Sequence, residues 1–274
     1  MGMNLREFLS NDHFISEGIP KEACATNRVQ KILGITWDSD KDIISIQCNF
    51  PSTPHLTKRI VARQIASIYD PFGWLVPLLT QPKRFQQDLW KQKFAWDTVL
   101  PKKIQEEWDT ITNNAHGFQQ SSSRQFFTKP GCSSLAIFAD ASSIAMSACA
   151  YIFTVNQSTL VMAKCKLPSI KSRPTIPKME KNALAFATRL AFSIFQAMET
   201  RLVKHPWDIY ISSDSQIALA WLSTSTNDTG LELLVNNRLK EIWKIVKALN
   251  EAGVAVQFKF VQPQKIQPTQ EQEA

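Results

Sequence analysis

Two apolar segments that each run into an aspartate restrict the fold of this chain more than any other feature. Residues 135–142 read Leu-Ala-Ile-Phe-Ala-Asp-Ala-Ser, and residues 207–214 read Trp-Asp-Ile-Tyr-Ile-Ser-Ser-Asp. Apolar runs of this length, bounded by turn-forming residues, are typical of buried strands. Because an unpaired carboxylate is costly inside a core, we expect Asp140 and Asp214 to lie at an opening, each at the end of its strand.

A helix predicted over residues 178–200 lies between these strands and carries a third acid, Glu180. The apolar residues of this helix recur at three- and four-residue steps that Glu180 continues: Leu184, Ala187, Ala191, Ile194, Phe195 and Met198. A carboxylate on the core side of a helix is uncommon unless something binds it. Converging carboxylates repel one another until divalent cations neutralise them. Asp140, Glu180 and Asp214 therefore form a candidate magnesium site, the alternative being that each is a helix cap or a solvated end.

The second half of the chain begins with three strands and continues with alternating helices and strands. The predicted strands are 135–140, 147–154, 159–166, 208–213 and 254–261, and the predicted helices are 178–200, 215–222 and 231–250. Three consecutive strands without an intervening helix predict an antiparallel meander. The Gln- and Pro-rich residues 263–274 are predicted to be disordered.

The first half is predicted to be mainly helical, with a small β-hairpin formed by residues 31–37 and 43–48. Its predicted helices are 57–69, 76–93 and 102–114, and a polar segment at 121–124 is expected to be a boundary. The helices carry many basic residues: Lys58, Arg59, Arg63, Lys83, Arg84, Lys91, Lys93, Lys102 and Lys103. These charges either solvate a surface or line a groove that follows phosphates.

Composition and charge favour a soluble protein with an acidic partner. The net charge of +7 points to nucleic acid first and to a membrane surface second. The 5 cysteines are scattered without a Cys-x-x-Cys pair, which indicates reduced thiols. The start lacks the pattern of a signal peptide, and no apolar run is long enough for a membrane span. We expect a nuclear or cytoplasmic location, in a reducing compartment.

Several of these segments resemble a known family. Residues 138–142, 174–180 and 212–215 are similar to the three acidic motifs of the ribonuclease H domain in Pao/BEL-type retrotransposon polyproteins. Residues 235–242 resemble the segment before that domain's last strand. Upstream, the similarity to the polymerase thumb or connection region lies in residues 33–37, 57–60 and 68–73. The resemblance covers almost the whole chain, with the motifs in the expected order.

The resemblance implies an α/β fold: a five-stranded mixed sheet flanked by helices, after a mainly helical thumb/connection-like region with a small hairpin. The implied domains are 1–120 and 130–262, followed by the tail 263–274. Asp140, Glu180 and Asp214 would be catalytic and would bind two Mg²⁺ or Mn²⁺ ions. The substrate would be the RNA strand of an RNA–DNA hybrid, recognised by backbone shape and 2′-hydroxyls. The expected nucleic-acid-binding residues are Lys58, Arg59, Arg63, Lys83, Arg84, Ser142 and Arg238.

Two departures from the family pattern leave three hypotheses open. No Tyr-x-Asp-Asp occurs, so we do not expect this chain to be a reverse transcriptase by itself, and Gln270 stands where the family carries a fourth Asp. The first hypothesis is a metal-dependent hybrid ribonuclease, complete or weakened. The second is a catalytically inactive, domesticated remnant that binds nucleic acid. The third is a protein-interaction module that docks partners through its helical first half.

Overall fold

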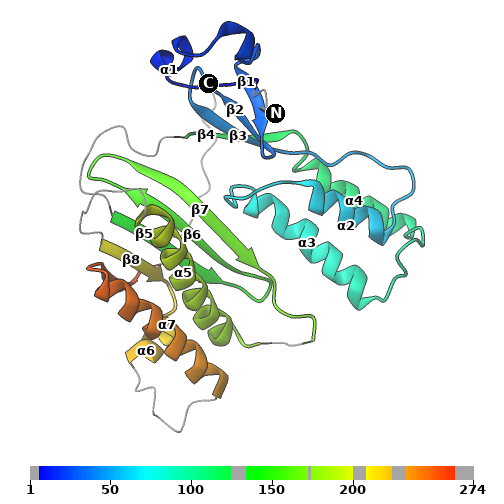
Figure 1. Cartoon of the computed structure of the whole chain (residues 1–274). Helices are drawn as coiled ribbons and strands as arrows, with labels where there is room; N and C mark the ends of the chain where they lie inside the picture. Colours follow the sequence, from blue (N-terminus) through cyan, green and yellow to red (C-terminus); the bar gives the residue numbers. More distant parts are fainter. Residues whose placement is uncertain (1–5, 125–133, 172–173, 200–207, 224–232, 263–274) are drawn as a thin grey trace, which may run out of the picture. The chain divides into compact units, whose positions relative to one another are not determined.

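The chain forms two compact units, residues 1–130 and 131–274, in the computed structural model (Figure 1). The structure describes residues 6–124, 134–171, 174–199, 208–223 and 233–262. The predicted disordered tail, 263–274, lies outside the described residues. Within the described part of the chain, no helix is both long and apolar enough to cross a membrane.

An antiparallel sheet with the strand order β1-β2-β3-β4 forms part of the first unit. Its strands are β1 (Val29–Ile32), β2 (Ile35–Asp38), β3 (Ile43–Cys48) and β4 (Phe118–Ser123). The predicted hairpin corresponds to the β2–β3 pair, so the sheet is larger than the sequence indicated.

One reason for the difference is a turn inside the segment predicted as a single strand, 31–37. Leu33 and Gly34 both adopt positive φ angles, +50° and +91°. Two successive residues of this kind form the tight turn that joins twisted antiparallel strands. The chain therefore reverses between β1 and β2 instead of continuing. Gly34 also lies so close to the Tyr69 ring that a Cβ atom would stand 2.7 Å from its Cδ1.

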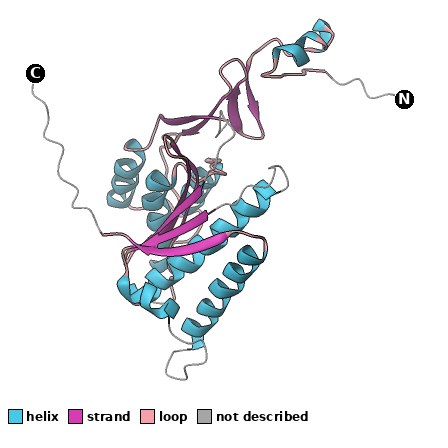
Figure 2. Ribbon diagram, turned by 90° about the vertical axis from the view of Figure 1, so that its left-hand side faces the viewer, coloured by secondary structure: helices cyan, strands magenta, loops and turns pink. Residues whose placement is uncertain are grey.

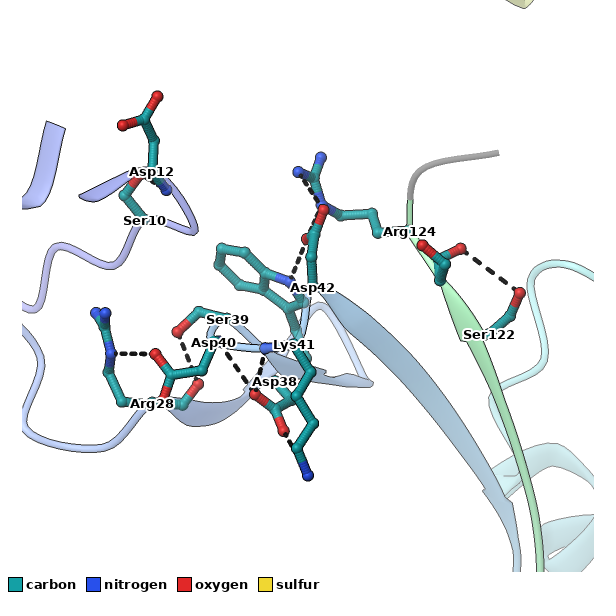
Figure 3. A network of polar contacts seen from close by, with 12 residues as sticks. Ser10, Asp12, Arg28, Asp38, Ser39, Asp40, Lys41, Asp42, Ser122 and Arg124 are labelled. Atoms are coloured by element: carbon teal, nitrogen blue, oxygen red, sulfur yellow. Dashed lines mark hydrogen bonds and ion pairs between the residues drawn. The ribbon is translucent and has the colours of Figure 1, made fainter. Parts of the chain in front are cut away.

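The other reason is β4, which includes most of the polar segment 121–124 that the sequence predicts to be a boundary. Its residues are mostly exposed, and they pair with β3 along its whole length. The Ser45 and Ser121 hydroxyls lie 2.8 Å apart across the two strands. Just after β4, Arg124 forms two hydrogen bonds with Asp42, which also accepts one from the Trp37 indole (Figure 3). A polar sequence is compatible with an exposed edge strand, so hydrophobic alternation could not reveal it.

The helical elements of the first unit are α1 (His13–Glu17), the 3-10 turn η1 (Lys21–Ala23), α2 (Lys58–Ser67), α3 (Val76–Lys91) and α4 (Lys102–Asn113). Helices α2, α3 and α4 pack around a buried tryptophan. Trp108 of α4 contacts the rings of Phe50 and Phe85. Its indole N–H donates to the buried Gln64 side chain at 3.0 Å, and Gln64 donates to the Pro51 carbonyl. Every polar atom of this pair is therefore satisfied inside the core.

The second unit contains a five-stranded mixed sheet with the strand order β7-β6-β5-β8-β9. Its strands are β5 (Ser134–Ala141), β6 (Met146–Phe153), β7 (Ser158–Lys166), β8 (Asp208–Ser213) and β9 (Ala255–Phe260). The first three form the predicted antiparallel meander, whereas β8 and β9 run parallel to β5. The predicted fold class is confirmed.

The helices of this unit are α5 (Ile176–Glu199), α6 (Gln216–Ser223) and α7 (Leu233–Glu251). Helices α5 and α7 lie side by side and cover one face of the sheet (Figures 1 and 2). Leu135 and Ile137 of β5 and Ile211 of β8 are fully buried beneath them. Because side chains alternate along a strand, Phe138 and Asp140 lie on the opposite face of β5.

Candidate metal centre

The three predicted acids meet at one edge of the second sheet. Strands β5 and β8 are parallel and in register, with Ala139 opposite Ser213. The residue that follows each of these two in the chain is an aspartate, Asp140 near the end of β5 and Asp214 directly after β8, so the two are level with each other. Helix α5 brings Glu180 to the same edge from its first turns. One carboxylate oxygen from each of the three lies within 4.8 Å of the other two.

Glu180 is the buried member of this cluster, with only 6% of its surface exposed, whereas Asp140 and Asp214 are exposed. The backbone N–H of Ala141 donates a hydrogen bond to its carboxylate. Its other oxygen, Oε2, is buried without a hydrogen-bond partner among the described residues. Burial, together with the charges of Asp140 and Asp214, raises the pKa of Glu180 to about 7.

This donor set fits a hard divalent cation. Mg²⁺ and Mn²⁺ prefer oxygen ligands, and carboxylates supply both the oxygen and the compensating charge. A bound cation or a proton would supply the partner that the buried Oε2 of Glu180 lacks among the described residues. The two exposed aspartates leave the outer side of the cluster open, so a ligand or substrate can approach from solvent.

Ser142 and Arg238, which we predicted to bind nucleic acid, both have partners within the second unit. The Ser142 hydroxyl accepts hydrogen bonds from the N–H groups of Ile144 and Ala145, and so shapes the turn between β5 and β6. Arg238 of α7 donates to Glu241 at 2.8 Å. Glu241 also accepts two hydrogen bonds from Arg189 of α5. Arg238 therefore holds, within α7, the same carboxylate that Arg189 of α5 binds.

The prediction that Lys58 lies on a basic surface is not supported by its position in the first unit. Lys58 is only 4% exposed, and its ammonium group donates to the Phe94 carbonyl. The same group lies 4.0 Å from the centre of the Trp90 ring and 5.0 Å from that of Trp96. The long aliphatic stem of lysine makes this burial tolerable when the charge is partnered.

The other predicted basic residues differ in how available they are. Arg59 is exposed but forms a two-point ion pair with Asp97, at 2.6 and 2.9 Å. Arg63 on α2 and Arg84 on α3 are exposed, and Lys83 is partly buried. These last three remain the candidates for phosphate contacts in the first unit.

Sequence reasoning missed two features of the centre. The Ala141 N–H that holds Glu180 belongs to the backbone, so no residue type marks it. The aromatic side chains on the same face of β5 as Asp140 were not singled out either. The alternation of residues 136, 138 and 140 could have indicated that Phe138 shares a face with the acid.

Comparison with known families identifies the chain at this point. Residues 57–215, more than half of the chain, match the model of the Pao retrotransposon-like RNaseH-like domain. The chain belongs to this family. The resemblance noted in the sequence is thereby confirmed, and the match includes all three acids of the cluster. A search of the curated proteins finds no match.

Solved structures that are similar to this Pao-type chain include RNase H proteins and a foamy viral protease-reverse transcriptase. LC11-RNase H1 in complex with RNA/DNA hybrid is 13% identical, covering 47% of this chain and 85% of its own, with a TM-score of 0.33. The N-terminal RNase H domain of rv2228c from Mycobacterium tuberculosis is 14% identical, with coverages of 47% and 82% and a TM-score of 0.30. The foamy viral protease-reverse transcriptase in complex with double-stranded DNA is 10% identical, with a TM-score of 0.48. That match covers 89% of this chain, which spans 40% of the viral protein.

Proposed function

We propose that this chain is a metal-dependent ribonuclease that hydrolyses the RNA strand of RNA–DNA hybrids, with Asp140, Glu180 and Asp214 as its metal-binding acids. The observation that carries the proposal is the approach of the three carboxylates to within 4.8 Å of one another. Family membership supports the reaction class, because the matched domain is RNaseH-like.

Each acid has its own role in the proposed reaction. When bound, divalent cations would activate a water molecule and stabilise the leaving oxygen of the phosphodiester. Asp140 and Asp214 would hold the cations on the exposed side, where the substrate phosphate arrives. Glu180 would be the buried anchor, oriented by the Ala141 N–H. Because a ligand carboxyl group must be ionised, Glu180 has to lose its proton, and we expect metal affinity to fall below pH 7.

The replacement of the family's fourth acid lowers the affinity for divalent metal ions that we expect of this centre. Gln270, which replaces it, lies outside the described residues. Three carboxylates provide three negative charges against the four positive charges of two divalent ions. An amide oxygen can contact a cation but contributes no charge. We therefore propose that one of the two ions binds more weakly, so that cleavage requires a high metal concentration.

Gln270 also favours a second candidate function, in which the chain binds nucleic acid without cleaving it. In that case the acids would be a remnant, and binding would depend on basic residues. We propose that the first unit corresponds to a thumb/connection region and that Arg63, Lys83 and Arg84 contact phosphates. A third candidate, docking of a protein partner on the helices of the first unit, would need none of these charges.

A nuclease assay on a labelled RNA–DNA hybrid distinguishes the candidates. The full chain would be tested over a range of Mg²⁺ and Mn²⁺ concentrations, beside Asp140→Asn and the control Asp109→Asn, which changes an exposed acid of α4. We expect cleavage by the original chain and by the control but not by Asp140→Asn. Hybrid binding with a steep salt dependence and no cleavage at any metal concentration would favour the second candidate. Neither binding nor cleavage would favour the third.

A further inference from the structure

The face of the second sheet that points away from α5 and α7 carries a group of aromatic side chains. Phe138 of β5, Tyr151 and Phe153 of β6, and Tyr210 of β8 all occupy alternate positions on this side. We call these four residues the aromatic platform. Phe138 is 42% exposed, although a large apolar side chain in the middle of a sheet is usually covered. The platform is therefore a surface that can accept a ligand.

Three residues of the platform, Phe138, Tyr151 and Phe153, line a hollow of about 570 Å³. Ala136 forms its floor, because Ala136 pairs with Tyr151 on one side and Tyr210 on the other. The rings of Phe138 and Tyr151 lie 6.0 Å apart at 77°, so they form two walls at an angle. The turn between β6 and β7, residues 154–157, closes one end of the hollow. Its volume falls within the range typical of small-molecule sites.

Polar and charged groups at the platform argue for a nucleic acid as the occupant. Lys259 of β9 places its ammonium group 4.0 Å from the centre of the Tyr210 ring, which brings a positive charge to the aromatic surface. Asn156 and Gln157 line the end of the hollow and offer amide groups that suit base edges. Asp208 also lies beside these rings, where its carboxylate accepts a hydrogen bond from the Tyr210 hydroxyl at 3.5 Å.

The aromatic platform lies next to the metal-binding acids along β5. Phe138 precedes Asp140 by two residues on the same strand and face, a separation of about 7 Å along β5. A strand of nucleic acid bound at the metal centre could thus continue directly onto the platform. Aromatic residues on neighbouring strands of an open sheet are a recurrent way of stacking unpaired bases.

We infer that the aromatic platform binds unpaired bases of single-stranded nucleic acid, with Phe138 and Tyr151 stacking on a base in the hollow and Lys259 contacting a phosphate. This inference goes beyond the proposed nuclease activity and does not require it. The binding would be measured without divalent metal, so its failure is distinct from a failure of cleavage.

The test is the affinity of the full chain for fluorescein-labelled oligo(U) and oligo(dT) of about 12 bases, measured by anisotropy in EDTA. We expect Phe138→Ala to weaken binding about 5- to 150-fold, the effect of losing one stacked base. Phe138→Trp keeps a ring and should retain affinity. The matched control is Phe118→Ala, because Phe118 is also a strand phenylalanine that is 42% exposed but lies in the first unit. Lys259→Ala should reduce the slope of log affinity against log salt by about 0.7.

Equal affinities for Phe138→Ala and Phe118→Ala, or no binding of either oligonucleotide, would overturn the inference. So would self-association that Phe138→Ala abolishes in sedimentation velocity, because a second copy would then be the occupant. If Phe138→Ala unfolds by circular dichroism, photocrosslinking of a 4-thiouridine oligonucleotide to the original chain decides the question. Crosslinks at Phe138, Tyr151 or Tyr210 support the platform, and crosslinks confined to α2 and α3 contradict it.

Discussion

Replacing Glu180 by glutamine should stabilise the metal-free protein at pH 8 and remove its response to metal. The amide keeps the shape of the carboxylate and can still accept the hydrogen bond from the Ala141 N–H. It removes a negative charge that is buried beside Asp140 and Asp214. The metal-free folded protein therefore no longer carries, at pH 8, a buried negative charge close to two others.

The size of the effect follows from the pKa of Glu180, which is raised from 4.5 to about 7 in the folded chain. Between these values the folded state binds more protons than the unfolded state, so stability falls as the pH rises. Below pH 4.5 there is no penalty, and above pH 7 it is complete. At about 1.4 kcal/mol per pKa unit, the full penalty for a shift from 4.5 to about 7 is between about 3 and 4 kcal/mol. Glu180→Gln should recover this amount at pH 8 and nothing at pH 4.

The assay is denaturant unfolding in EDTA at several pH values between 4 and 8. Because the two units need not unfold together, unfolding should be followed by hydrogen exchange of peptides from β5 and α5. Glu251→Gln is the control, since Glu251 is an exposed glutamate of the same unit. Addition of Mg²⁺ should stabilise the original chain according to its affinity and concentration. The same addition should have little effect on Glu180→Gln.

Two results would refute this reasoning. If Glu180→Gln and Glu251→Gln show the same pH dependence as the original chain, the Glu180 carboxylate is not buried beside two other charges. If Glu180→Gln is less stable than the original chain at pH 8 without metal, the carboxylate forms a favourable interaction that the structure does not contain.

Three further predictions concern the first unit, each measured by denaturant unfolding followed through hydrogen exchange of peptides from that unit. Gln64→Leu should cost about 2 kcal/mol, because the Trp108 indole N–H would lose its buried acceptor; no loss of stability would contradict that bond. Lys58→Met should cost about 1–3 kcal/mol through loss of its cation–π contacts and hydrogen bond. The affinity of Lys58→Met for the RNA–DNA hybrid should stay unchanged, and a weaker affinity would show that Lys58 contacts the nucleic acid. Gly34→Ala should cost at least about 1 kcal/mol, because φ is +91° and the added Cβ meets Tyr69; a neutral outcome would mean that the turn adopts another conformation.

The sequence by itself determined the elements of the second unit and the identity of its acids. The strands there show apolar runs or, in β9, apolar residues that alternate with polar ones, and Glu180 stands out because it continues an apolar stripe. These signals are strong because burial against a helix layer requires regular apolar spacing. The parallel pairing of β5 with β8 then places Asp140 and Asp214 at one edge.

Only the tertiary structure decided the features that depend on partners distant in sequence. β4 pairs with β3 although its residues are polar, because backbone hydrogen bonds do not require apolar side chains. Lys58 is buried because Trp90, Phe94 and Trp96 provide partners for its charge, and nothing near Lys58 in the chain indicates this. Local patterns report which side chains prefer burial, whereas the contacts that satisfy a charge or a backbone group exist only after the chain has folded.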